Sequence, residues 1–140
     1  IWLGPQPQKI VLENYRSADL FVLPSVIAKN GDRDGLPNVL LEAQSQGVAC
    51  ISARLPGISE LIADDTTGIL IDPGDVTALS AAISNLAQDP QRRRQLGTAA
   101  LRRVREHFSL VEHIGHLASL FGLSPAEEDQ AECKLRSTAP

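Results

Sequence analysis

The chain of 140 residues is poor in several residue types, and each shortage narrows the kinds of protein it can be. It has no methionine, two cysteines and 4% aromatic residues. Two isolated cysteines do not make a disulfide framework, so a reducing compartment is expected. Cys50 lies within an apolar run, and we interpret it as a small core residue. Because aromatic residues are scarce, the core must consist mainly of Leu, Ile, Val and Ala.

Long apolar runs and excess positive charge are also missing. No segment approaches the ~18 consecutive apolar residues of a membrane-spanning helix, and no signal peptide is recognisable in these residues. We therefore expect a cytoplasmic protein, with peripheral association at the inner membrane surface as the alternative. The formal net charge of −4 argues against nucleic acid as the main partner.

Several familiar catalytic motifs are absent from the sequence. There is no GxGxxG after an apolar run and no GxxxxGK[ST], so neither a dinucleotide site nor a Walker-type phosphate site is predicted. His113 and His116 could share a helix face, but no third ligand accompanies them, so we expect no metal. Ser25 and Ser45 lack the His–Asp context of a nucleophilic serine.

The segments that are present alternate between short apolar runs and helical periodicity. The apolar runs at 20–23, 48–52 and 68–71 are typical of strands covered on both faces, and Ile1–Leu3 is expected to be the end of another strand. Helices are predicted at 9–16, 37–46, 58–63, after Asp75, after Asp89 and at 110–121. This alternation predicts an α/β fold, a Rossmann-like parallel sheet with helices on both faces. We expect one partial domain over 1–121 and a disordered tail over 122–140.

The stretch from Asp34 to Glu42 (DGLPNVLLE) carries the clearest chemistry. Pro37 suits the first position of a helix, where its missing N–H costs nothing. The free N–H groups of that first turn, with the positive end of the helix dipole, form an anion site. Asn38 and Glu42 are four residues apart and share a face, roughly 6 Å apart along the helix axis. One ligand could therefore place a phosphate at the helix start and a hydroxyl-bearing group beside Glu42.

This stretch also has an ordinary structural interpretation, in which both acids are merely solvated. We favour the functional one, because the helix is apolar at Val39, Leu40 and Leu41, and an acid in a buried helix needs a partner or a site. Gly57 and Glu60 could form a second loop at the same edge of the sheet, although alone they would indicate an ordinary turn.

Six arginines gather between residues 92 and 105. They could form a patch for a polyanion, but no aromatic residues are interleaved with them and acids outnumber bases in the chain. We therefore interpret this segment as a solvated helix surface.

Two longer motifs resemble a known family. YRSADLFVLPS at residues 15–25 and DGLPNVLLEA at residues 34–43 are similar to the nucleotide-sugar half of retaining glycosyltransferases of family 4, also called glycosyl transferases group 1. Later signals follow in the family's order, from Gly57-Ile-Ser-Glu60 through Thr67–Asp75 to Asp89-Pro90. The similarity covers about Trp2 to Phe121 and implies the C-terminal donor-binding domain of a GT-B fold.

The resemblance implies roles for particular residues. Asp34 and Glu42 match the spacing of the family's Glu-x7-Glu pair. Asp34 would be the catalytic acid that contacts hydroxyls of the donor sugar, and Glu42 would accept hydrogen bonds from the ribose diol. Asp34 is one methylene shorter than the usual Glu. Donor-binding backbone groups are expected at Gly35, Leu36, Asn38, Val39 and Gly57, and no cofactor or metal is implied.

The same resemblance implies an activity. The intact enzyme would transfer a hexose, with retention, from a nucleotide diphosphate sugar to a saccharide or lipid-linked acceptor. The N-terminal acceptor-binding domain and the basic diphosphate clamp lie upstream in the family, so we interpret this chain as a fragment that would be inactive alone. The alternative is a non-catalytic nucleotide-sugar-binding or assembly module from a truncated or split gene.

Overall fold

The structure is a computed structural model that describes residues 1–123, with the side chains of 110–113 left out. Residues 124–140, nearly all of the tail expected over 122–140, lie outside the described residues. The chain divides into two compact units, Ile1–His107 and Phe108–Pro140, and each is described by itself. The first unit carries the sheet and every predicted site residue.

Three parallel strands form the sheet of the first unit. They are β1 (Phe21–Leu23), β2 (Cys50–Ala53) and β3 (Ile69–Ile71), in the order β1-β2-β3. Val22 lies opposite Ile51, which in turn lies opposite Ile69. All four residues of β2 are buried, as predicted for a strand covered on both faces. The predicted Rossmann-like α/β fold is confirmed.

The strand expected at Ile1–Leu3 is wrong for the described chain. These three residues adopt no regular secondary structure, and Trp2 is 94% exposed. A strand exists only by pairing with a neighbour, and no described segment pairs with this one.

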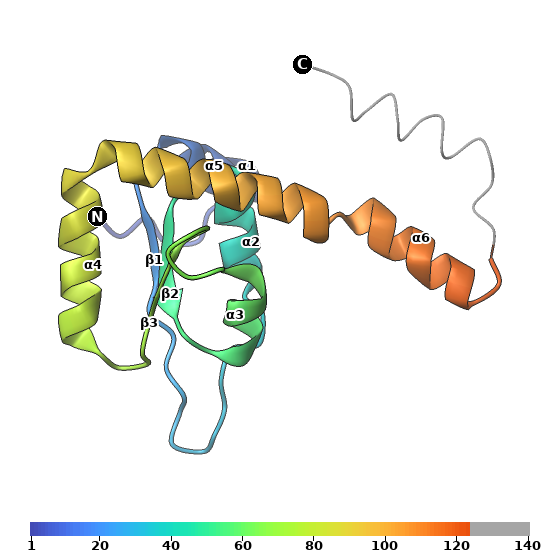
Figure 1. Ribbon diagram of the computed structural model, residues 1–140, viewed down its shortest axis with the longest axis horizontal. Coiled ribbons are helices and arrows are strands. Elements are labelled where there is room, and N and C mark those ends of the chain that lie inside the picture. The colour runs from blue at the N-terminus through green and yellow to red at the C-terminus, as the bar shows by residue number, and fades with distance from the viewer. Residues whose placement is uncertain (124–140) are drawn as a thin grey trace. The chain divides into compact units, whose positions relative to one another are not determined.

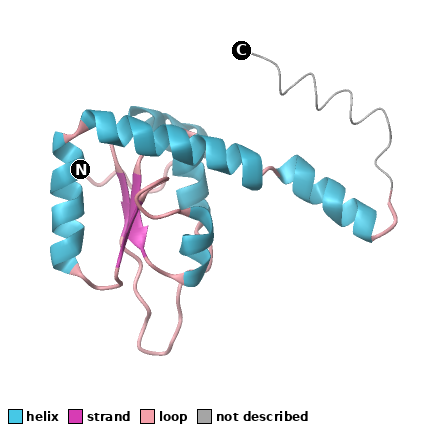
Figure 2. Ribbon diagram, viewed as in Figure 1, coloured by secondary structure: helices cyan, strands magenta, loops and turns pink. Residues whose placement is uncertain are grey.

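Helices surround the sheet on both faces, as predicted. In the first unit they are α1 (Gln8–Ser17), α2 (Asn38–Ser45), α3 (Pro56–Leu61), α4 (Val76–Gln88) and α5 (Pro90–His107). The second unit contains α6 (Leu110–Leu120). Figure 1 shows α4 on one side of the sheet and α2 and α3 on the other, and Figure 2 shows the three strands running the same way between them.

The starts of α4 and α5 follow their sequence signals. Asp75 Oδ1 accepts a hydrogen bond of 2.8 Å from the N–H of Ala78, and Asp89 Oδ1 accepts one of 2.8 Å from the N–H of Arg92. Each aspartate therefore satisfies one of the N–H groups that a helix start leaves without an internal partner. Pro90 is the first residue of α5, where its missing N–H costs nothing.

The core is aliphatic, as the composition predicts. Its fully buried members include Leu40, Ile51, Ile58 and Leu96. Among the described residues, Tyr15 is the one aromatic side chain in the buried core, at 8% exposure. Because Tyr15 belongs to α1, it anchors that helix in the same core as the sheet.

Helix α5 lies directly against the turn between α2 and β2. A Cβ added at Gly97 would lie 2.0 Å from the carbonyl oxygen of Gly47, so only a glycine allows this approach. Gly47 itself has φ +76°, a left-handed conformation that glycine adopts without strain. Gly47, which follows the helix predicted over 37–46, thereby also provides backbone against which α5 packs.

Three of the six arginines do more than cover a solvated surface, which corrects the sequence interpretation. Arg92 donates to the carbonyl oxygen of Asp65 over 2.6 Å and pairs with its carboxylate. Arg93 donates to Asp19 over 2.9 Å and to the carbonyl oxygen of Leu86, at the end of α4, over 2.6 Å. The sequence could not reveal these partners because they are distant along the chain.

Arg103 is the third, and it fastens α5 to the end of α3. Its Nε donates to the carbonyl oxygen of Leu61 and its Nη2 to that of Glu60, each over 2.8 Å. These carbonyls belong to the last turn of a helix, where no intrahelical N–H remains to satisfy them. The positive charge also suits the negative end of the helix dipole.

The Arg103→Ala substitution should lower the free energy of unfolding by about 1.5–3 kcal/mol, the range for hydrogen bonds to charged groups. Arg102→Ala is the matched control, because Arg102 is exposed on the same helix and should change stability by less than about 0.5 kcal/mol. Urea unfolding of the two variants measures both values. Equal stabilities would contradict the role given to Arg103.

Candidate functional site

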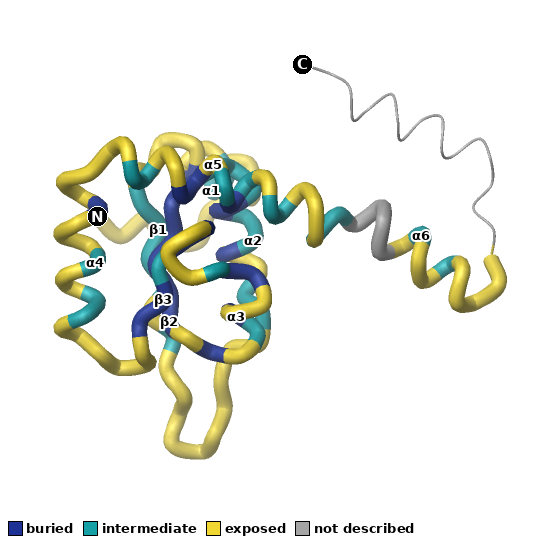
Figure 3. Tube along the Cα trace, in the orientation of Figure 1, coloured by how far each residue is buried: buried dark blue, intermediate teal, exposed yellow. Residues whose placement is uncertain are grey.

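The candidate site lies where the three strands end. The connections that follow β1, β2 and β3 leave the same edge of the sheet, since the strands are parallel. In Figure 1 the connection between β1 and α2 extends beyond that edge, and α5 crosses the opposite one. Most of this connection is exposed, in contrast to the buried strand β2 (Figure 3). Ligands of open α/β sheets bind outside the carboxyl ends of the strands.

Asp34 stands at the base of this loop and is held there by Ser25. The Ser25 hydroxyl donates a hydrogen bond of 2.6 Å to Asp34 Oδ2. Ser25 follows β1 almost directly, so the bond closes the loop onto the end of the sheet. The Asp34 carboxylate is exposed, and one of its oxygens is fixed by a neutral donor.

Two of the predicted donor-binding residues, Gly35 and Gly57, lie in direct backbone contact. A Cβ added at Gly57 would lie 2.5 Å from both the carbonyl carbon and the carbonyl oxygen of Gly35, and 3.0 Å from the Leu36 nitrogen. The loop after β1 therefore touches the first turn of α3, the helix that follows β2, so Gly57 lies inside a helix and not in the second loop that the sequence predicted. The sequence interpretation placed Gly57 at the same edge as Asp34, and the structure brings it against the adjacent residue.

Helix α2 begins beside this contact, one residue later than predicted. Pro37 has ψ 123°, so it precedes the helix instead of forming its first turn, and Asn38 is the first helical residue. No side chain caps the N–H groups of this turn, in contrast to the aspartate caps of α4 and α5. Asn38 and Val39 are exposed. The uncapped turn keeps the character of an anion site.

Glu42 lies one turn further along α2 and is half-buried. Both of its carboxylate oxygens face donors on α1. Gln8 Nε2 donates to Oε1 over 3.0 Å, and the Tyr15 hydroxyl faces Oε2 at 3.5 Å. An ionised carboxylate offers about four acceptor positions, so the contacts with α1 leave others for a ligand. Glu42 thus has partners on α1 and still has acceptor positions available for a ligand.

Tyr15 is placed by burial and by an aromatic contact. Its ring packs edge-on against Phe21 of β1, with ring centroids 5.5 Å apart and planes at 83°. Burial raises the pKa of its phenol, and the charge and hydrogen bond of Glu42 raise it further. The hydroxyl therefore keeps its proton throughout the neutral range and remains a donor toward Glu42.

A basic side chain also lies at this edge, but carboxylates already occupy it. Arg54 follows β2 and pairs with Asp64 at 2.5 Å and with Asp72 at 3.6 Å. Partial burial raises the pKa of Asp64, but the Arg54 pair and the Leu70 N–H lower it by more, so that pKa lies below its ordinary value. Arg54 is thereby committed to the protein's own acids.

Cys50 takes no part in this edge. It is fully buried in β2, and burial raises the pKa of its thiol to about 12. A thiol in that state is a poor nucleophile at neutral pH. The sequence interpretation of Cys50 as a core residue is confirmed.

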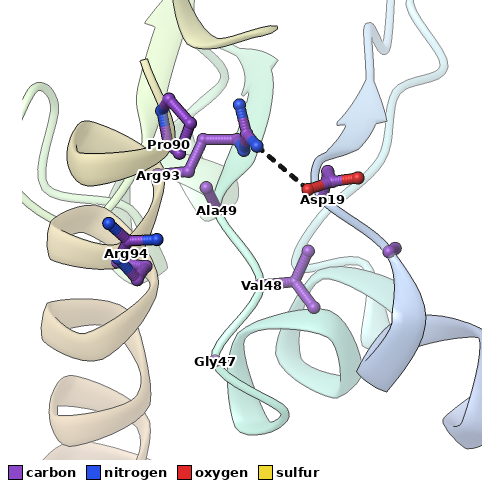
Figure 4. A pocket seen from close by; sticks show the side chains of 8 residues that line it. Asp19, Gly47, Val48, Ala49, Pro90, Arg93 and Arg94 are labelled. Atoms are coloured by element: carbon purple, nitrogen blue, oxygen red, sulfur yellow. Dashed lines mark hydrogen bonds and ion pairs between the residues drawn. The ribbon is translucent and has the colours of Figure 1, made fainter. Parts of the chain in front are cut away.

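A surface cavity of about 160 Å³ lies at the other end of the sheet. The cavity is lined by Asp19, Val48, Ala49, Pro90, Arg93 and neighbouring residues, as Figure 4 shows. Arg93 is paired with Asp19. These residues belong to the amino ends of the strands and to the start of α5. None of the predicted site residues is among them, so the cavity and the candidate site are separate features.

Sequence reasoning missed the side chains that hold the two acids. Ser25 was considered only as a nucleophile, and neither Tyr15 nor Gln8 was connected with Glu42. The available signal for Ser25 was its place directly after an apolar strand. Nothing comparable marked Gln8, since its contact with α2 depends on how two helices pack.

The described residues contain no group of three His, Cys, Asp or Glu side chains arranged to hold a metal ion. Within the same part of the chain, none of the helices has both the length and the apolar character to cross a membrane.

The fold and the edge described above define a class, an α/β Rossmann-like domain of the kind found in GT-B glycosyltransferases. The chain matches the family described as glycosyl transferases group 1 over residues 1–103. It belongs to that family.

Two relatives illustrate the match. The amylovoran biosynthesis glycosyltransferase AmsK of Erwinia amylovora is 38% identical over 86 residues, covering 61% of this chain and 21% of that protein. A D-inositol 3-phosphate glycosyltransferase of Corynebacterium diphtheriae is 30% identical over 138 residues, covering 99% of this chain and 30% of the relative. The chain thus spans between about a fifth and a third of the length of these relatives.

Solved structures share the fold at lower identity. Sucrose-phosphate synthase from Thermosynechococcus elongatus superimposes with a TM-score of 0.77 at 24% identity, covering 86% of this chain and 29% of that one. Anabaena HepE in complex with UDP and glucose gives a TM-score of 0.74 at 19% identity, covering 87% and 31%.

Gly57→Ala should force the loop after β1 away from the start of α3, because the added Cβ has backbone atoms of Gly35 only 2.5 Å away. Amide hydrogen exchange in peptides that cover residues 31–40 should then be faster than in the unaltered protein. Gly115→Ala is the control, since a Cβ there meets nothing within 4 Å. Unchanged exchange in the Gly57 variant would contradict the contact.

Proposed function

We propose that the complete natural protein containing this chain is a retaining glycosyltransferase of family 4. It transfers a hexose from a nucleotide diphosphate sugar to a saccharide or lipid-linked acceptor, and this chain supplies the donor-binding half. An acceptor-binding domain elsewhere in the protein would complete the enzyme. Membership of the family and the relatives named as glycosyltransferases support this proposal.

The contact between Gly35 and Gly57 is the observation that carries the proposal. It joins the loop after β1 to the first turn of α3, beside the uncapped start of α2. Backbone N–H groups in this position can approach a diphosphate closely, because glycine adds no side chain between them. With Arg54 paired with Asp64 and Asp72, the proposal assigns the diphosphate to the fixed backbone dipoles at the start of α2.

Glu42 supports the nucleotide part of the proposal. Its carboxylate lies one helical turn from the uncapped N–H groups, on the same side as Asn38. This separation fits the distance between the ribose and the pyrophosphate of a single nucleotide. Among the fold neighbours, HepE has been solved with UDP-glucose, at a TM-score of 0.69.

The chemistry follows from the charge that develops during transfer. The bond between the sugar and the nucleoside diphosphate breaks through an oxocarbenium-like state, and negative charge grows on the leaving diphosphate. Preorganised N–H groups at the start of α2 stabilise that charge without reorganising. Asp34, fixed by Ser25, would hold hydroxyls of the donor sugar at the reacting centre. The proposed reaction uses no resident metal or cofactor.

Glu42→Ala should weaken binding of the nucleoside diphosphate by about 1.5–3 kcal/mol, through loss of charge-assisted bonds to the diol. Isothermal titration calorimetry on the complete natural protein measures this, with the nucleotide chosen from a panel of uridine, guanosine and adenosine diphosphates. Glu13→Ala is the control, because it removes an exposed carboxylate from α1 and should leave affinity unchanged. An unchanged affinity in the Glu42 variant would refute its role.

Asp34→Ala should lower turnover roughly 10- to 150-fold, the equivalent of one lost hydrogen bond to a charged group. Nucleotide affinity should change by less than about 2-fold, because the residue acts on the sugar at the reacting centre. Asp32→Ala, an exposed acid in the same loop, should leave both quantities unchanged. Equal losses of turnover and affinity would mean that Asp34 acts in binding, and absence of any turnover in the unaltered protein would favour the non-catalytic binding module.

A further inference from the structure

Helix α1 contacts α2 through three donor side chains, and two of them reach the same carboxylate. Gln8 and Tyr15 face the two oxygens of Glu42. The third, Arg16, donates from Nε to Oε1 of Gln46 over 2.7 Å. The two contacts on Glu42 therefore do more than attach α1 to α2, because they also restrict where the Glu42 carboxylate can lie.

The two donors to Glu42 differ in how firmly they are placed. Gln8 is an exposed side chain at the first turn of α1, where water can replace its amide. Tyr15 is 8% exposed, and its ring is enclosed by the core and by Phe21. Its hydroxyl cannot move away from Glu42 without moving the ring, so it acts as a rigid donor.

The distance between the Tyr15 hydroxyl and Oε2 of Glu42 is 3.5 Å, at the outer limit of a hydrogen bond. A contact of this length contributes orientation more than attraction. Because the phenol is largely buried, it gains from keeping the carboxylate as its partner. The Tyr15 hydroxyl and the Gln8 amide thereby restrict the orientation of the Glu42 carboxylate before any ligand arrives.

We infer that Tyr15 is a positioning residue for Glu42, which fixes the carboxylate in the orientation that accepts the ribose diol. This inference rests on the proposed function and extends it to a specific consequence. Without the hydroxyl, Glu42 must be ordered by the ligand at the moment of binding, and that ordering lowers affinity. The loss should fall on nucleotides that have the diol, because only those use Glu42.

Tyr15→Phe in the complete natural protein tests the inference. The variant keeps the ring against Phe21 and removes only the hydroxyl. Calorimetric affinity for the preferred nucleoside diphosphate should fall about 3- to 10-fold, the cost of ordering the Glu42 side chain when the ligand binds. Affinity for the 2′,3′-dideoxy analogue should change by less than about 2-fold, since it has no diol to place.

Two further variants separate positioning from a purely structural effect. Arg16→Ala breaks another link between α1 and α2 and should leave the preference for the diol unchanged. In the Glu42→Gln background, adding Tyr15→Phe should cause less than about a 2-fold further loss, because the two residues act as one unit. Full additivity of the two substitutions would overturn the inference.

The outcomes distinguish this inference from the proposal beneath it. If the unaltered protein prefers the diol nucleotide and Tyr15→Phe retains that preference in full, Tyr15 has no positioning role while the proposed function stands. Equal losses for the diol and dideoxy nucleotides would likewise reduce Tyr15 to a structural residue. If the unaltered protein binds no nucleoside diphosphate, the proposed function fails and the inference fails with it.

Discussion

The pairing of β2 with both neighbouring strands is the constraint on which the rest of the first unit depends. This strand of four residues is buried throughout and fixes the positions of β1 and β3. Parallel strands must be joined by crossovers, so every strand ends at the same edge. The loop that follows β1 and the start of α3, which follows β2, are consequently brought together, and their contact at Gly35 and Gly57 creates the candidate site.

The two ends of the strands differ in how they are packed. At the amino end, α5 covers the α2–β2 turn through Gly97 and Gly47, and its arginines fasten other segments. At the carboxyl end, the helix that starts from the loop after β1 is left uncapped. The amino end is thus tightly fastened, while the carboxyl end leaves the start of α2 open.

Much of this architecture could be predicted from the sequence, because local patterns specify it. Apolar runs gave the three strands, and Asp75 and Asp89 marked two helix starts that the structure confirms. Spacing along one helix placed Asn38 and Glu42 on a common face. These features depend on residues close together in the chain, where periodicity and capping chemistry are decisive.

The features that could not be predicted from the sequence depend on contacts between distant segments. Tyr15 meets Glu42, and Arg93 meets Asp19, only because the helices pack in a particular way. No local pattern encodes such pairings, so the interpretation of the six arginines as a solvated surface is wrong for three of them. The segment Ile1–Leu3 shows the converse, since an apolar run predicts a strand but cannot supply the neighbour that a strand requires.

A crystal structure of the complete natural protein with its preferred nucleoside diphosphate tests the central claim most directly. The account predicts that the diphosphate lies against the first turn of α2, beside Gly35 and Gly57. The ribose hydroxyls should lie about 3 Å from the carboxylate of Glu42, the ordinary length of such a hydrogen bond. A nucleotide bound instead in the cavity lined by Asp19 and Arg93 would contradict it.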